Sequence, residues 1–305
     1  MDKLSPIPRS PFTRRSTAEE VTADVDLRGK TILITGCNSG LGFETMRVLA
    51  KRGAHVIGAA RTRGKAEDAA AEVGLEITPV TCELSDLASV VACSEEVEAL
   101  NRPIDVLICN AGIMGPPALQ QKYGLELQFV TNHLGHFVLV NRLLERLKQA
   151  PAGRVVMVSS LGHLTSVPGV INFDHLSGER GYVPFTFYGQ YKLANLLMSN
   201  ELARRLEGSM TTSNAIHPGI IMTPLMRNLG DFRNSLTKLV SWPFSRNVQL
   251  GAATQCYVAT SPALEGVSGQ YFSDCNPATK SFHGRNPELA RRLWDVSEEL
   301  AADYL

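Results

Sequence analysis

The chain has 305 residues, 44% of them hydrophobic, which is enough for one large α/β domain or two small ones. Lys+Arg and Asp+Glu number 30 each, so no basic excess points to a nucleic-acid partner. Six scattered cysteines without a C-x-x-C pair indicate reduced, mostly buried thiols. No run reaches the ~20 apolar residues of a membrane span, and the polar N-terminus is unlike a secretory signal. We therefore expect a cytoplasmic protein with no membrane span.

Residues 1–25 are expected to form an N-terminal arm that is loose to about residue 20. Within it, Ser16-Thr17-Ala18-Glu19 has the pattern of a capping box, with Ser16 as N-cap and Glu19 three positions later. This pattern predicts a short helix ahead of the first strand.

Thr31–Thr35 is an apolar, β-branched run that predicts a buried strand, and apolar residues at helical spacing follow it. Three glycines separate the two elements. Gly36 permits a tight turn, Gly40 lets a phosphate approach the backbone, and Gly42 lets the helix pack closely on the strand. The start of the helix directs free N–H groups and a positive dipole end at this turn, which suits a pyrophosphate. A glycine turn alone is a weak signal, because ordinary strand–helix connections can look the same.

Residues 54–60 predict a second strand, and the residues after it bear on the cofactor. In dinucleotide-binding folds an acidic residue about 20 positions past the glycines binds the adenosine ribose of NAD. Here Arg61 and Arg63 stand in that region, and no carboxylate does. The Arg61 guanidinium could pair with a 2′-phosphate, so we expect NADP(H) to be preferred, with NAD(H) possible. The alternative is that both arginines merely begin a solvated helix.

Strands and helices alternate along the rest of the chain. Further strands are predicted at 75–81, 104–109, 154–158, 212–216 and 269–272. Helices are predicted from just after residue 86 to about 100, and at about 124–148, 188–207 and 249–260. The alternation predicts a single Rossmann-like, doubly wound parallel sheet of about seven strands with helices on both faces. Residues 26–305 are expected to form one domain whose N-terminal half binds a dinucleotide. The irregular stretches 161–187 and 220–247 are expected to cover an apolar substrate.

Tyr188 and Lys192 have the spacing of neighbours on one helix face, and this pair carries the predicted chemistry. Reducing a carbonyl by hydride transfer requires a proton donor at the oxygen, and a free tyrosine has a pKa of about 10. The Lys192 ammonium, together with an oxidised nicotinamide, would lower the pKa of Tyr188. Ser160 ends a predicted strand, where it could hydrogen-bond the substrate oxygen. Asn132 could fix a water that relays protons to Lys192. Such a tyrosine–lysine pair also arises by chance on many helix surfaces.

Four motifs in the same order suggest a family: Thr35-Gly36-x-x-x-Gly40-x-Gly42, Asn110-Ala111-Gly112, Ser160 and Tyr188-x-x-x-Lys192. With them the chain resembles the short-chain dehydrogenase/reductase family over about residues 16–303. The leader and the segment Gly269-x-Tyr271-Phe272-Ser273-Asp274-Cys275 are similar to its retinol dehydrogenase-like branch, which includes the oxidoreductase domain of the WW-domain oxidoreductase.

The resemblance implies a role for each matching position. The catalytic residues would be Asn132, Ser160, Tyr188 and Lys192. The pyrophosphate would contact Gly36, Asn38, Ser39, Gly40, Leu41 and Gly42. The remaining cofactor contacts would be Arg61 at the 2′-phosphate, Glu83 and Leu84 at the adenine, Asn110, Ala111 and Gly112 at the nucleoside, Tyr188 and Lys192 at the nicotinamide end, and Pro218, Gly219 and Thr223 at the carboxamide. Glu83 stands where the family usually has an aspartate. A homodimer or homotetramer is possible, and no metal is expected, so His133 and His136 are assigned to packing or to cofactor-adjacent roles.

The predicted function is therefore an NADP-preferring oxidoreductase that interconverts an alcohol and an aldehyde or ketone on a small apolar substrate, with Tyr188 as general acid/base. Two alternatives remain open. One is reduction of a C=C bond or a pigment, as in the related protochlorophyllide reductase. The other is a regulatory or scaffold protein that binds a dinucleotide without turnover.

Overall fold

The computed structural model describes residues 7, 9–165, 171–221 and 245–305. Its centre is an eight-stranded sheet in the order β12-β11-β8-β7-β4-β1-β2-β3. All neighbours in this sheet are parallel except β11 and β12, which are antiparallel. The parallel strands are β1 (Thr31–Thr35), β2 (His55–Ala60), β3 (Ile77–Thr81), β4 (Val106–Cys109), β7 (Arg154–Val158), β8 (Thr212–His217) and β11 (Tyr271–Ser273), and β12 is Asn276–Pro277. The predicted fold class is confirmed, with the short β12 added to the seven expected strands.

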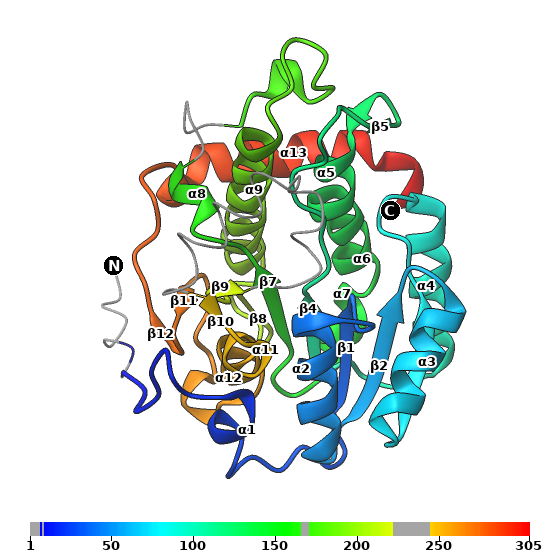
Figure 1. Ribbon diagram of the computed structural model, residues 1–305, viewed down its shortest axis with the longest axis vertical. Helices are drawn as coiled ribbons and strands as arrows, with labels where there is room; N and C mark the ends of the chain where they lie inside the picture. The colour runs from blue at the N-terminus through cyan, green and yellow to red at the C-terminus, as the bar shows by residue number, and fades with distance from the viewer. Residues whose placement is uncertain (1–6, 8, 166–170, 222–244) are drawn as a thin grey trace.

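Helices cover both faces of the sheet (Figure 1). Successive side chains of β1 point to opposite faces of the sheet, so both faces carry apolar residues that need cover. Leu33 packs into one core with α4 (Leu87–Ala99), α6 (Gly135–Arg142) and α9 (Pro184–Arg205). Ile32 and Ile34 pack into the opposite core with α2 (Gly40–Lys51), α3 (Arg63–Val73) and α12 (Ala253–Thr260). Strands buried on both faces need apolar residues at every position, which accounts for the continuous apolar runs in the sequence.

The order of the strands locates the functional site. From β1 the chain builds outward to β2 and β3, and then returns to β4 on the other side of β1. Ligands of doubly wound sheets bind at the carboxyl ends of the strands beside this reversal. Gly36 directly follows β1, Asn110 directly follows β4, and Ser160 lies two residues after the end of β7. The fold therefore brings the three motifs to one edge of the sheet.

The region predicted as one helix over 124–148 is more complex. A two-residue hairpin, β5 (Gln121–Lys122) with β6 (Leu125–Glu126), precedes a short α5 (Leu127–Phe129). A π-helical turn then spans Val130–Leu134, in which the Gly135 N–H donates to the Val130 carbonyl, before α6 and α7 (Leu144–Lys148). Such turns shift the face that a helix presents and are frequent at functional sites. The turn contains Asn132.

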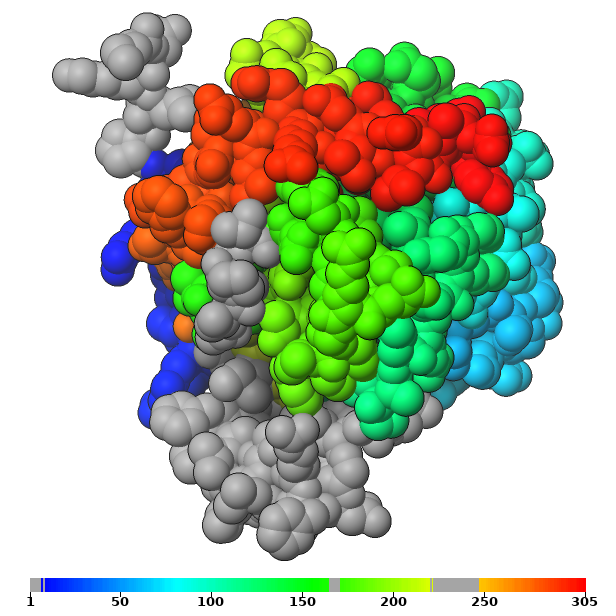
Figure 2. Space-filling view, turned by 90° about the horizontal axis from the view of Figure 1, so that it is seen from above, coloured from blue at the N-terminus to red at the C-terminus, as the bar shows by residue number. Residues whose placement is uncertain are grey.

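Other helix boundaries also differ from the predicted ones. The long helix α9 begins at Pro184, whose ring suits the first helical position, and not at Tyr188. The predicted helix at 249–260 is two pieces, α11 (Val248–Gly251) and α12. A helix that was not predicted, α13 (Pro287–Leu300), packs against α9, and in Figure 2 it lies across the molecule in orange to red.

The N-terminal arm is docked where the structure describes it. Ser10 donates to the Cys275 carbonyl over 2.9 Å, and the Phe12 ring lies edge-on to Tyr257 with 5.8 Å between ring centroids. Its helix α1 (Ala18–Val21) starts one residue later than predicted, with Thr17 as N-cap. The expectation of a loose arm up to about residue 20 is therefore wrong for this part of it.

The two stretches expected to cover the substrate are only partly described. In the first lie α8 (Gly162–Thr165), a 3₁₀ turn at Phe173–His175 and the start of α9. In the second, β9 (Ile220–Ile221) pairs with β10 (Ser245–Arg246). Residues 166–170 and 222–244 lie outside the described parts of the chain. The role of both stretches stays a prediction.

Candidate active site

The glycine turn has the geometry of a phosphate cradle. Gly36 and Gly40 have φ values of +72° and +56°, which favour glycine. A β-carbon on Gly42 would lie 2.1 Å from the Gly36 carbonyl oxygen, so only glycine lets α2 start this close to the strand. Ser39 is the N-cap of α2 without a side-chain cap hydrogen bond. The first turn therefore offers main-chain N–H groups and a positive dipole end, and these residues fit a pyrophosphate.

The neighbouring predicted positions differ in exposure. Asn38 and Ser39 are exposed at the tip of the turn, and Leu41 is half-buried. Cys37 is fully buried in the core, and burial raises the pKa of its thiol to about 12. It contributes packing and no reactive thiolate to this turn.

The predicted nucleoside segment is attached to the end of β1. The Thr35 hydroxyl accepts hydrogen bonds from the N–H groups of Asn110 and Ala111, both over 3.0 Å. The Asn110 side chain in turn donates to the Thr35 carbonyl over 2.8 Å. A β-carbon on Gly36 would lie 3.0 Å from that of Ala111, so the glycine turn and this segment are in contact.

Asn132 is fully buried and bonds to the main chain of Ile113 with both ends of its amide. Its Oδ1 accepts from the Ile113 N–H over 2.7 Å, and its Nδ2 donates to the Ile113 carbonyl over 2.9 Å. A β-carbon on Gly112 would lie 2.9 Å from Asn132 Oδ1 and 3.8 Å from Lys192 Nζ. Asn132 and Lys192 therefore both lie against Gly112, and the Asn132 side chain holds the loop after β4, while the water relay stays a prediction.

Lys192 is buried, with 4% of its surface exposed, and it points at the end of β7. Its Nζ donates to the Val158 carbonyl over 3.0 Å, and Asn195 donates to the same oxygen over 3.2 Å. The Ser159 hydroxyl donates to the Lys192 carbonyl, which ties α9 to the strand end. Burial lowers the pKa of Lys192 from 10.5 to about 8.

Tyr188 and Ser160 lie close together, since a β-carbon on Gly162 would be 3.6 Å both from Ser160 Oγ and from the edge of the Tyr188 ring. The Lys192 Nζ lies 5.7 Å from the centroid of the Tyr188 ring. The surrounding protein raises the pKa of Tyr188 to about 12, because desolvation outweighs the lowering effect of the nearby Ser160 hydroxyl. In the protein alone desolvation is the larger effect on this pKa, and the lowering predicted for Lys192 together with an oxidised nicotinamide stays a prediction.

His163, which sequence reasoning did not single out, helps to hold Ser160. Its Nδ1 donates to the Ser160 carbonyl, and its Nε2 accepts from the Ser281 N–H over 3.3 Å. The ring also lies edge-on to Tyr271, 4.8 Å between centroids. The only hint in the sequence was the spacing of three residues from Ser160. The C-terminal segment around Ser281 thus contacts the loop that carries the serine.

The two arginines after β2 have different surroundings. Arg63 pairs with Glu67 over 3.1 Å and with Glu96. Arg61 is exposed, and within the described residues it makes no hydrogen bond or ion pair. The solvated-helix interpretation therefore applies to Arg63, while the Arg61 guanidinium is available to an anion.

The predicted adenine and carboxamide positions lie at the ends of β3 and β8. Glu83 Oε1 accepts from the Ser85 N–H and hydroxyl over 3.1 and 2.9 Å. Leu84 is buried in the core, so it could offer a ligand only its main chain. Pro218 is buried, and Gly219 has a φ of +96°. Thr223 lies outside the described residues.

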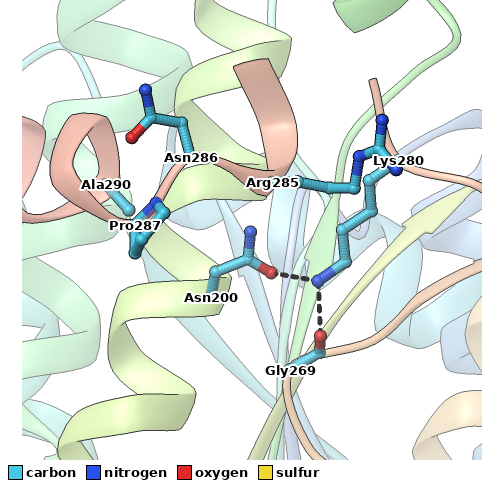
Figure 3. Close-up of a pocket in the computed structure, with 7 residues that line it drawn as sticks. All are labelled: Asn200, Gly269, Lys280, Arg285, Asn286, Pro287 and Ala290. Atoms are coloured by element: carbon cyan, nitrogen blue, oxygen red, sulfur yellow. Dashed lines mark hydrogen bonds between the residues drawn. The ribbon is translucent and has the colours of Figure 1, made fainter. Parts of the chain in front are cut away.

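A cavity of about 290 Å³ lies elsewhere, between the C-terminal half of α9 and the start of α13 (Figure 3). Lys280 Nζ donates there to Asn200 Oδ1 over 2.7 Å and to the Gly269 carbonyl over 2.5 Å. The other lining residues are Arg285, Asn286, Pro287 and Ala290. None of these residues belongs to the predicted site, and Lys280 serves to tie α9 to the segment after β12.

The sequence profile of the family described as short chain dehydrogenase matches residues 30–234. Among similar proteins, the short-chain dehydrogenase TIC 32 B, chloroplastic, of Brassica napus is 43% identical over 305 residues, covering 96% of this chain and 95% of that protein. Retinol dehydrogenase 14 of Homo sapiens is 41% identical over 292 residues, covering 89% and 86%. The WW domain-containing oxidoreductase of Gallus gallus is 39% identical over 311 residues, covering 98% and 75%.

A solved structure is similar over nearly the whole chain. The crystal structure of an uncharacterized protein from Mycobacterium paratuberculosis has a TM-score of 0.75 and 36% identity, and the match covers 94% of this chain and 97% of that one. None of the helices in the described parts of the chain has the length and hydrophobicity needed to cross a membrane. The chain belongs to the short-chain dehydrogenase/reductase family of oxidoreductases, in the branch that contains the retinol dehydrogenases and the WW domain-containing oxidoreductase.

Proposed function

We propose that this protein is an NADP-preferring dehydrogenase/reductase that interconverts an alcohol and an aldehyde or ketone on a small apolar substrate. The observation that carries the proposal is the proximity of Tyr188 and Ser160 beside buried Lys192, at the sheet edge that also holds the glycine turn. A scaffold protein would have no physical need for a buried lysine cation next to a tyrosine, because that charge destabilises the fold.

Each residue has a distinct role in this proposal. The nicotinamide would supply the hydride, while the protein orients and polarises. Ser160 holds the substrate oxygen beside the Tyr188 hydroxyl, which gives up its proton in reduction and takes it back in oxidation. In the protein alone the pKa of Tyr188 is about 12, so the tyrosine is a proton donor at neutral pH. Lys192 and the positive oxidised nicotinamide would together favour the phenolate in oxidation.

The cofactor preference rests on Arg61. Its guanidinium is exposed and unpaired within the described residues, beside the start of α3, whose N-cap Thr62 makes no side-chain cap hydrogen bond. A 2′-phosphate would gain both a charge-assisted hydrogen bond and the helix dipole there. Glu83, Leu84, Asn110, Gly112, Pro218 and Gly219 would contact the rest of the cofactor.

Nucleotide binding is tested by titrating the protein with NADPH and NADH and following nicotinamide fluorescence. We expect tighter NADPH binding, and we expect Arg61→Ala to weaken NADPH about tenfold while leaving NADH nearly unchanged. Arg63→Ala is the matched control, because that arginine is already paired with Glu67 and Glu96. Equal losses for both nucleotides would rule out Arg61 as the selector.

Turnover is tested on a panel of apolar aldehydes and alcohols with NADPH and NADP. Wild type should turn over at least one of them, and Tyr188→Phe should bind NADPH normally with kcat reduced at least ~100-fold. If neither variant turns anything over although both bind NADPH, the scaffold alternative is favoured.

Three further expectations remain proposals. They are the single domain over 26–305, a homodimer or homotetramer, and a cytoplasmic location. The name of the Brassica relative places that protein in the chloroplast, so location is best settled by imaging the tagged protein in its own cell.

A further inference from the structure

We propose that His136 is a positioning residue that holds Asn132 in place by linking it to Thr35 at the end of β1. The inference rests on the proposed function, because it assigns how one residue of that site is held. It concerns a buried histidine for which the sequence suggested only packing or a place near the cofactor.

The hydrogen bonds around Thr35 and His136 form a single chain with a determined direction. The Thr35 hydroxyl oxygen accepts from the N–H groups of Asn110 and Ala111, which occupies both of its lone pairs. Its proton is therefore directed to His136 Nε2, 2.9 Å away. His136 Nδ1 lies 3.1 Å from the Asn132 carbonyl oxygen, to which it can only donate. The ring is thus neutral, with its proton on Nδ1.

Burial makes this chain rigid. His136 and Asn132 are both fully buried, and both ring nitrogens of His136 have partners. His133, three residues earlier, is also fully buried, but among the described residues only its Nε2 has a partner, the Ser297 hydroxyl over 2.8 Å. A fully satisfied polar network in a low-dielectric interior holds one geometry, because each broken bond leaves an unpaired polar group.

The charge state of His136 suits the same arrangement. Burial lowers its pKa to about 4, and the nearby Lys192 charge acts in the same direction. A protonated ring would have no acceptor for the Thr35 hydroxyl. The neutral ring is therefore the form that completes the chain.

The hydrogen bonds from Thr35 through His136 to Asn132 join three parts of the site that lie far apart in sequence. These are the end of β1 with its glycine turn, the loop after β4, and the π-helical turn that carries Asn132. The Asn132 amide then grips Ile113 beside Gly112 and Lys192. Misplacing a site group by about 1 Å can cost on the order of 100-fold in rate, so a residue that fixes Asn132 matters for turnover.

The test compares His136→Phe with His133→Phe, two buried histidines on the same helical segment. We expect His136→Phe to lower kcat about 10- to 100-fold, with the NADPH Kd and the substrate KM within about threefold of wild type. His133→Phe should keep kcat within about threefold of wild type. Equal kcat losses in both variants, or an unchanged kcat in folded His136→Phe, would overturn the proposal.

A second measurement does not depend on activity. In ¹⁵N NMR spectra of the protein alone, His136 should be the Nδ1–H tautomer, and the Asn132 side-chain amide should be protected from exchange. That protection should be lost in His136→Phe and kept in His133→Phe. An Nε2–H tautomer, or protection retained in His136→Phe, would refute the link even if the enzyme proves active. Protection lost as expected in a protein without turnover would instead refute the proposed function alone.

If His136→Phe does not fold, substitutions at Thr35 test the other end of this hydrogen-bond chain. Thr35→Ser keeps the hydroxyl, and Thr35→Val removes it at nearly constant volume. We expect the serine variant to retain the Asn132 protection and the valine variant to lose it. Retention in a folded Thr35→Val variant would overturn the proposal.

Discussion

At the scale of single residues, burial sets the chemistry of the proposed site more than direct charge pairing does. Desolvation raises the pKa of Tyr188 to about 12 and lowers that of Lys192 to about 8. Both shifts work against the charged form, which is the expected direction for groups taken out of water. The site is therefore held at a cost in stability that a protein without catalysis would not need.

Lys192→Met should stabilise the protein at pH 7. The unfolded chain keeps the lysine proton up to about pH 10.5, while the folded protein loses it near pH 8. Below pH 8 the wild type carries the full cost of a buried charge, at most about 3 kcal/mol, and that cost falls as the pH rises toward 10.5. Urea unfolding at pH 7 and at pH 10 should show a gain from the substitution that shrinks with pH. A gain of the same size at both pH values would contradict this explanation.

Gly42→Ala should damage both folding and nucleotide binding. The added β-carbon would meet the Gly36 carbonyl oxygen at 2.1 Å, and since both groups are held by main chain, the turn must shift. We expect a loss of about 2–4 kcal/mol in unfolding free energy and loss of NADPH binding. Gly64→Ala is the control, because Gly64 is helical with open space around it and should gain up to about 1 kcal/mol. Equal effects of the two substitutions on unfolding would argue against close packing as the cause.

At the scale of elements, helix boundaries depended on contacts that the local sequence could not specify. Ser16-Thr17-Ala18-Glu19-Glu20 allows two capping registers, and the predicted one pairs Ser16 with Glu19. In the structure Glu19 pairs instead with Arg47 and Lys51 on α2, over 2.8 and 3.0 Å. That leaves Glu20 to close the box with Thr17. A contact between α1 and α2 thus decided the register.

Thr17→Ala should therefore loosen α1, and Ser16→Ala should not. Loss of an N-cap hydroxyl costs about 1 kcal/mol, which corresponds to roughly fivefold faster local exchange. The measurement is hydrogen exchange at the Glu20 amide, which donates to the Thr17 hydroxyl over 3.2 Å. Faster exchange in Ser16→Ala than in Thr17→Ala would restore the predicted register.

At the scale of the whole molecule, segments that are far apart in the sequence pack together around the sheet. The arm contacts the segment after β11 through Ser10 and Asn276, and α13 packs on α9. All six cysteines are buried and none of them is part of a disulfide, in line with what their spacing indicated. They are spread over strands, turns and helices of both cores.

The thiols provide a test of that packing. A thiol reagent such as Ellman's should modify fewer than one cysteine per chain in the folded protein and all six after unfolding in guanidinium. Burial raises the pKa of Cys37 to about 12, so even this cysteine in the glycine turn should not react. Rapid modification of one thiol at neutral pH would show that part of the fold opens readily.

The sequence by itself determined the α/β class, the positions of the seven parallel strands and the motifs at their ends, because apolar periodicity and glycine spacing are local properties. Only the tertiary structure decided how those motifs are held together. The π-helical turn at Asn132, the tautomer of His136, the contact between His163 and Ser281, and the pKa of Tyr188 all depend on partners from distant parts of the chain. Hydrogen-bond direction and desolvation follow from packing in three dimensions, and no spacing along the sequence encodes them.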